Sequence, residues 1–259
     1  MYIEKAAYGS LEISKITELI SRRCRSEIGA LVARNIEIVS VAFMLEAAEE
    51  NGLLSGEELV KIRLLLTLSG RMKEALSDAR EEYPNFGILL RDMRDFSEEA
   101  RMLAVIDDDG HLYDYASEKL SLLRQQMRGL KETVRRRGHA LLNDPSVTGM
   151  LQERVLTLRN GRYAFLVRQD ALSQFPGSVI DRSGSGSSVY MEPRSLMSLN
   201  NEYSKLYGEE MLEETRIFRE FTAKLINRKN GIVDTENVLG TIDLFYALSE
   251  MTRVYKWRV

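Results

Sequence analysis

Arginine side chains gather around one short segment of this sequence, and their type and spacing suit phosphate binding. Arg159 and Arg162 flank the dipeptide Asn160-Gly161, and Arg182 follows about twenty residues later. The planar guanidinium donates two parallel hydrogen bonds to a phosphate group. The surrounding residues 150–192 hold five basic and four acidic side chains, so an ordinary soluble hairpin explains the same arginines without a ligand.

A serine- and glycine-rich stretch directly after Arg182 offers further phosphate contacts. Ser183, Ser185 and Ser187 carry hydroxyl groups, and the backbone N–H groups of this loop are additional donors. Contacts of this kind to nucleic-acid phosphates need no special motif. A flexible connection between two strands has the same composition, and both interpretations stay open.

A second basic cluster consists of Arg135, Arg136 and Arg137, within a stretch that is rich in basic residues. Residues 117–143 hold seven basic and two acidic side chains, although the whole chain carries a net charge of −3. Such an uneven charge distribution predicts that this part of the chain meets a polyanion. A solvated helix face is the alternative explanation.

Residue types that catalysis or metal binding needs are scarce. One cysteine and two histidines nearly exclude a Cys/His zinc site, and no G-x-x-x-x-G-K-[ST] phosphate loop occurs. The triple aspartate before Gly110 does not match the spacing of an EF-hand calcium loop. We interpret His139 as solvated, and the acid pairs Glu209-Glu210 and Glu213-Glu214 as charges on an exposed helix face. We expect no catalytic residue, cofactor or metal in this chain.

Composition bounds the class of protein. The 259 residues are 44% hydrophobic, and no apolar run approaches the length of a membrane span. The first residues carry Glu4 and lack the apolar core of a secretion signal. A single cysteine is typical of a reducing compartment. We therefore expect a soluble, cytoplasmic protein without a membrane partner.

Hydrophobic residues recur at helical spacing along most of the chain. We predict helices over about residues 11–34, 36–50, 55–72, 86–105, 116–143, 195–229 and 235–255. The helix over 116–143 has only a narrow apolar stripe, which favours packing on one partner helix. Gly110 is predicted to cap a helix end, and Asn230-Gly231 is predicted to end the helix over 195–229.

The pattern changes to short β-strands between residues 151 and 191. Two β-rich runs in VLTLRNGRYAFLV are joined at Asn160-Gly161, the strongest short signal for a hairpin. SVIDR and SSVYME are two further strand candidates. We therefore predict a mainly α fold with a small antiparallel β insert. The two long helices should form an antiparallel pair that carries the sheet at its far end.

Several motifs in this order resemble the MutS family, specifically its type-two branch. They are the R-N-G-R-Y turn, the G-S-V-I-D-R-S strand and serine loop, the Y-M-E-P strand end and the L-N-N-E start of the returning helix. That branch is linked to suppression of recombination and to stalled-ribosome handling. The resemblance is strongest from about Asp107 to Leu206.

The resemblance implies a division into core, lever and clamp. It assigns residues 1–115 and 230–259 to a helical core, 116–149 and 193–229 to the two lever helices, and 150–192 to a β-rich clamp tip. Members of the family are homodimers that close around DNA and carry an ABC-type ATPase domain. This sequence ends where that domain would begin. We therefore expect no ATP or Mg²⁺ site in this chain, and expect both only in a protein in which an ATPase domain follows. The chain itself is expected not to be an enzyme.

Two functions remain open from the sequence. The first is a non-catalytic module that binds branched or double-stranded DNA through its backbone, in DNA repair or recombination. The second is a structural module that docks a protein, a ribosome or a second copy of itself without binding nucleic acid.

Overall fold

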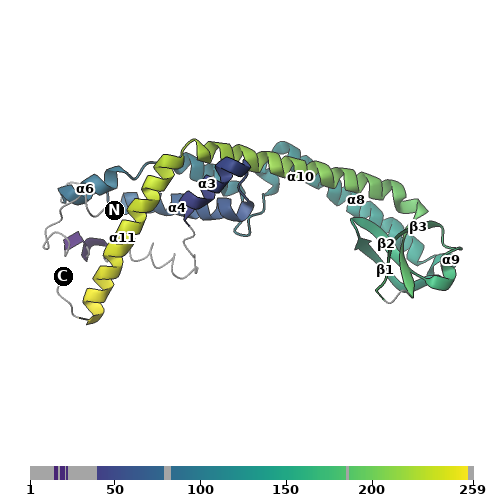
Figure 1. Cartoon of the computed structure of the whole chain (residues 1–259). Helices are drawn as coiled ribbons and strands as arrows, with labels where there is room; N and C mark the ends of the chain where they lie inside the picture. Colours follow the sequence, from purple (N-terminus) through teal and green to yellow (C-terminus); the bar gives the residue numbers. More distant parts are fainter. Residues whose placement is uncertain are drawn as a thin grey trace. The chain divides into compact units, whose positions relative to one another are not determined.

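The computed structural model of the chain describes residues 15–16, 18–20, 22, 40–78, 83–184 and 187–255. These residues are mainly helical and include one small antiparallel sheet, which confirms the predicted fold class at this level (Figure 1). The chain divides into two compact units, residues 1–113 with 217–259, and residues 114–216. The first predicted helix falls mostly outside the described residues.

The helical unit, residues 1–113 with 217–259, is built from helices of different lengths. They are α3 (Val41–Asn51), α4 (Gly56–Ala75), α6 (Pro84–Arg91), α7 (Ser97–Met102), a 3₁₀ turn (Leu103–Val105), the last part of α10 (Met197–Ile226) and α11 (Lys229–Tyr255). Ser55 begins α4 in a capping box, because its hydroxyl accepts from the Glu58 N–H while the Glu58 carboxylate accepts from the Ser55 N–H. The local sequence thus fixes this helix start.

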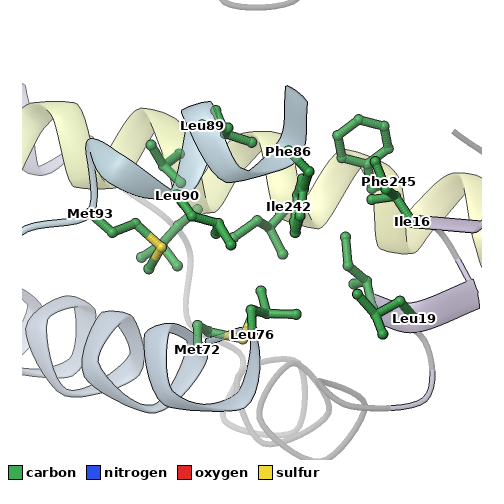
Figure 2. Packing of buried hydrophobic residues seen from close by; sticks show 13 residues of the cluster. Ile16, Leu19, Met72, Leu76, Phe86, Leu89, Leu90, Met93, Ile242 and Phe245 are labelled. Atoms are coloured by element: carbon green, nitrogen blue, oxygen red, sulfur yellow. The ribbon is translucent and has the colours of Figure 1, made fainter. Parts of the chain in front are cut away.

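The core of the helical unit forms where α4, α6 and α11 meet. Met72 of α4, Phe86 of α6 and Ile242 of α11 are almost fully buried in one cluster (Figure 2). The rings of Phe86 and Phe245 meet edge to face, with centroids 6.2 Å apart. The apolar stripes of these helices therefore pack on one another, as their periodicity predicts.

The single helix predicted over residues 86–105 is wrong, because the chain breaks between α6 and α7. Residues 92–96 are not helical, and Met93 and Phe96 in this break are buried. The Asp95 carboxylate accepts the N–H of Ser97 and forms a turn immediately before α7. Burial of the two apolar side chains and this new start interrupt the helical pattern.

Two predicted helix ends are also wrong. Gly110 has a φ of 88°, as a left-handed residue should, but it lies in a loop closed by the bridge between Ile106 and Leu112. Asn230 and Gly231 lie in the first turn of α11 instead of ending α10, which ends at Ile226. A Cβ on Gly231 would come within 2.7 Å of the Arg94 side chain, so this glycine permits close packing.

The second unit, residues 114–216, contains a long helix, a sheet and the start of a second long helix. Its elements are a 3₁₀ turn (Asp114–Ala116), α8 (Glu118–Leu142), α9 (Pro145–Thr148), β1 (Leu151–Arg159), β2 (Arg162–Arg168), β3 (Gly177–Arg182), β4 (Ser188–Pro193), 3₁₀ turns at Gln169–Ala171 and Arg194–Leu196, and the first part of α10. Four predicted strands are therefore present.

Within this unit α8 and α10 form an antiparallel pair. Leu123, Met127, Leu130 and Val134 of α8 share a buried cluster with Leu196, Leu199, Tyr203 and Leu206. Arg124 near the start of α8 contacts Glu210 and Glu214, whereas residues 126–133 of α8 lie beside residues 199–209 of α10. The narrow apolar stripe of α8 thus covers one partner helix, as the sequence predicts.

The sheet has strand order β1-β2-β4-β3, and all neighbours are antiparallel. Asn160 and Gly161 have φ values of 49° and 72°, so the predicted dipeptide makes the left-handed turn of a tight hairpin. The inner face of the sheet buries Phe165, Val167 and Met191 with Val147 of α9. This small core fixes the sheet beside the end of α8.

Candidate nucleic-acid interface

Arg159, at the end of β1, is held by an ion pair in the sheet. Its Nε donates to Asp181 Oδ2 over 2.6 Å, and its guanidinium carbon lies 5.1 Å from the centre of the Tyr190 ring. The hydrogen bond from Arg159 lowers the pKa of the Asp181 carboxyl below its ordinary value. About half of the Arg159 side chain is exposed. Arg159 therefore reaches the surface with its charge already partly balanced.

Arg162 belongs to a buried polar network. Its guanidinium donates to Glu192 Oε1 over 2.6 Å and to Asn201 Oδ1 over 2.6 Å. The Asn200 amide donates to Glu192 as well as to the Tyr163 carbonyl, and it accepts from the Tyr163 N–H. Asn200 is fully buried and Glu192 is 4% exposed. Arg162 thus anchors the hairpin on α10, which the sequence did not indicate.

Arg182 and the serine loop lie at the edge of the sheet. The Arg182 side chain is exposed, and its backbone N–H donates to Asp181. Ser183 pairs with Ser188 through backbone and hydroxyl groups, which closes the loop. Ser187 accepts the N–H of Gln169 at its carbonyl. The predicted contact Ser185 lies outside the described residues.

Arg135, Arg136 and Arg137 are all exposed on α8, as expected for a basic helix face. Within the described part of the chain, none of the three forms an ion pair with a carboxylate. Of these three, Arg135 lines a groove that also holds Lys131 and His139. These side chains recur at steps of three or four, so they share one face of the helix.

This groove, which we call the α8–hairpin groove, lies between α8 and the β1–β2 hairpin and has a volume of about 540 Å³. The helix contributes Arg128, Lys131, Glu132, Arg135, His139 and Leu142, and the hairpin contributes Arg154, Val155, Leu156 and Tyr163. Four permanent cations and one carboxylate therefore line the groove, and one of the cations, Arg128, is also paired with Asp114 over 2.8 Å. Such a surface attracts anions and is suited to phosphate.

An irregularity in β1 builds the hairpin side of the groove. Neighbouring side chains of a regular strand point to opposite faces, yet Arg154, Val155 and Leu156 all line this groove. The pairing of β1 with β2 shifts between Leu151 and Leu156, and such a bulge redirects side chains. The groove cannot be predicted from the sequence, because nothing in the residue pattern marks the shift.

The interpretation of the acid pairs on α10 as a solvated face is wrong for three of the four acids, and it fits only Glu209, which is 40% exposed. Glu210 and Glu214 accept from Arg124 of α8 over 2.7 Å each, and Asp114 accepts from the same guanidinium over 2.9 Å. Arg124 is 19% exposed. This charged layer continues the contact between α8 and α10 beyond their apolar stripe.

Glu213 lies deepest among these acids, with 3% of its side chain exposed. Its carboxylate accepts from Arg216 over 2.7 Å and from the Ser117 hydroxyl over 2.9 Å, with Lys119 at 3.5 Å. The hydrogen bond from Arg216 is the largest effect that lowers the pKa of Glu213 to about 2. The pattern could have revealed this role, because Glu213 falls on the buried side of α10.

No helix among the described residues is long and apolar enough to cross a membrane.

The carboxylates of Asp107 and Asp109 lie near His111 in the loop before α8. The Asp107 carboxylate already accepts the N–H groups of Asp109 and His111, so these acids shape a turn.

Comparison with known proteins finds relatives that are similar in sequence to most of this chain. No family model matches the chain. It is 33% identical over 216 residues to Endonuclease MutS2 of Listeria welshimeri, which covers 82% of this chain and 28% of that protein. Endonuclease MutS2 of a Geobacillus strain is 28% identical over 223 residues, covering 85% of this chain and 28% of the relative. The protein of the same name from Finegoldia magna is 27% identical over 281 aligned positions, covering 95% and 36%.

The chain thus spans between 28% and 36% of the length of these relatives. The similarity includes the region in which the motifs resemble the type-two branch of the MutS family. Over most of its length, this chain is therefore related to bacterial proteins named Endonuclease MutS2.

Proposed function

We propose that residues 114–216 bind the phosphate backbone of DNA, branched or double-stranded, without carrying out chemistry on it. The observation that carries this proposal is a set of exposed arginines that have no carboxylate within ion-pair distance in the described part of the chain. They are Arg135, Arg136, Arg137, Arg154 and Arg182. The relatives are named endonucleases, which act on nucleic acid, and this supports DNA as the polyanion.

The arginines of the predicted site differ in how available they are. The pair between Arg159 and Asp181 is solvent-exposed and therefore weak, so a phosphate competes with Asp181 for Arg159. Arg162 bonds to the buried Glu192, so it positions the hairpin and contributes less to DNA. Ser183 and Ser187 lie in a surface loop next to Arg182, so they contribute phosphate contacts only there.

The antiparallel pair of α8 and α10 suits a stalk that presents the sheet to DNA. This part of the proposal uses the lever and clamp roles that the resemblance implies. The predicted five-part domain division stays a prediction. Support comes from the packing within residues 114–216, where one pair of helices carries a sheet with its own small core. The unit offers charge and shape for gripping a large ligand.

Two variants that lose the same number of positive charges at different places test the proposal. We would compare a variant with Arg135, Arg136 and Arg137 each changed to Gln against one with Arg71, Arg91 and Arg101 each changed to Gln. The second set is exposed in the helical unit, so both variants lose three charges. Fluorescence anisotropy with a labelled branched DNA should show at least a tenfold loss for the α8 variant and less than a twofold loss for the control. Equal losses, or no binding by the native chain at low salt, contradict the proposal.

A second candidate function, docking of a protein, rests on a different surface. Tyr115 is 68% exposed and Leu122 is 54% exposed, and both line a shallow groove of about 410 Å³ near the start of α8. Exposed apolar side chains that form a contiguous patch are typical of interaction sites. The homodimer and the ribosome contact that the resemblance implies stay predictions. Light scattering of the purified chain tests self-association.

A further inference from the structure

The α8–hairpin groove contains more than the charges that a duplex backbone needs. Val155 is 50% exposed in the groove, next to the half-buried Leu156 and Tyr163. Phosphate contacts use cations and hydrogen-bond donors, so they leave these apolar groups in water. An apolar and aromatic surface beside a basic one is instead the arrangement that holds unpaired bases.

The size of the groove agrees with a small ligand. Its volume of about 540 Å³ falls within the range of about 300–1,000 Å³ that small-molecule sites occupy. Arg135 on the helix side and Arg154 on the strand side both line it, so a bound group meets a cation from each wall. Neither arginine forms an ion pair with a carboxylate of the described residues. Their charge is therefore available to a ligand.

Tyr163 is held in place before any ligand arrives. Both of its backbone polar groups are bonded to the buried side chain of Asn200, over 3.0 Å each. Its ring meets Tyr203 edge to face, with centroids 5.7 Å apart, and Lys131 lies 5.6 Å from the Tyr203 ring centre. A fixed ring loses little freedom when a base packs against it, which favours binding.

We infer that the α8–hairpin groove takes one unpaired nucleotide of a single-stranded or branched DNA. The base packs on Val155, Leu156 and Tyr163, and the adjoining phosphate bonds to Arg135 and Arg154. This inference rests on the proposed function and adds the class of nucleotide that the site selects. Arg136 and Arg137, which do not line the groove, meet neighbouring phosphates of either strand type.

The first experiment separates base contact from phosphate contact. We would measure the anisotropy of a labelled oligothymidylate and of a labelled duplex of equal length with the full chain and with Val155→Ser. Val155→Ser removes apolar surface on which the base would pack, so it should weaken binding of the single strand about fivefold. Binding of the duplex should change less than twofold. Circular dichroism of the variant confirms that it folds.

Matched arginine variants locate the phosphate. Arg135→Gln should weaken oligothymidylate binding about tenfold, whereas Arg136→Gln on the next position of α8 should weaken it less than threefold. Equal effects of the two variants overturn the groove as the binding place.

The native chain supplies a test that does not depend on any variant. An oligonucleotide that contains 5-iodouracil, irradiated in complex with the chain, should attach to a residue of the groove, with Tyr163 as the expected residue in peptide mapping. Attachment only outside the groove overturns the inference. Duplex binding without single-strand binding overturns it too but leaves the proposed function standing, whereas binding of neither DNA overturns both.

Discussion

Replacing Glu213 by Gln removes the charge at the centre of the polar layer between α8 and α10 and keeps the shape of the side chain. The pKa of Glu213 falls from 4.5 to about 2 on folding. At about 1.4 kcal/mol for each pKa unit, this difference corresponds to roughly 3 kcal/mol of stability at neutral pH. Its partners Lys119 and Arg216 are more than half exposed, so screening reduces the measured loss to about 2 kcal/mol.

The pH dependence identifies the cause of this loss. A lowered pKa in the folded state means that the unfolded chain binds more protons as the pH falls, so the contribution of Glu213 is complete above about pH 5 and disappears toward pH 2. Urea unfolding followed by circular dichroism at pH 7, 5 and 3 should therefore show a gap between the native chain and Glu213→Gln that closes at low pH.

A control on the same helix separates this effect from a general loss of charge. Glu209 is 40% exposed and lies 3.8 Å from Lys205, so Glu209→Gln should cost less than about 0.5 kcal/mol at each pH. A gap for Glu213→Gln that is equally large at pH 3 and pH 7, or one as small as that of the control, would refute the reasoning.

Two further changes test how the sheet is attached to the helices. Asn200→Leu breaks the bonds to Tyr163 and to Glu192 and should cost about 2–4 kcal/mol in urea unfolding, whereas Asn201→Ala should cost less than about 1 kcal/mol. Gly138→Val should destabilise by about 1–3 kcal/mol in thermal unfolding, since even a Cβ at Gly138 comes within 2.5 Å of Leu156. Gly129→Ala, in open space on the same helix, should stabilise by up to about 1 kcal/mol.

Local signals predicted most of residues 114–216. The Asn160-Gly161 turn follows from the local preference of these two residues for positive φ. The narrow apolar stripe of α8 is itself enough to indicate a single partner helix. Errors arose where a distant partner decides the outcome. Met93 and Phe96 interrupt a helical pattern because both side chains are buried against other helices. The sequence near them carries no sign of this burial.

The candidate site was predicted only in part, for the same physical reason. The three arginines of α8 are exposed as expected, because helix periodicity alone separates them from the apolar stripe. The sequence does not show that Arg162 bonds to the buried Glu192, since 30 residues separate the two. Nor does it show that a shift in strand pairing turns Arg154 toward α8.

The salt dependence of DNA binding by the native chain tests the central claim most directly. Affinity for a labelled branched DNA, measured by anisotropy between 50 and 200 mM salt, should fall steeply because bound cations release counterions from the backbone. Three phosphate contacts give a slope of log K against log salt of about −2.7, and we predict a value at least this steep. A slope shallower than about −1, or no binding at 50 mM salt, would contradict the account.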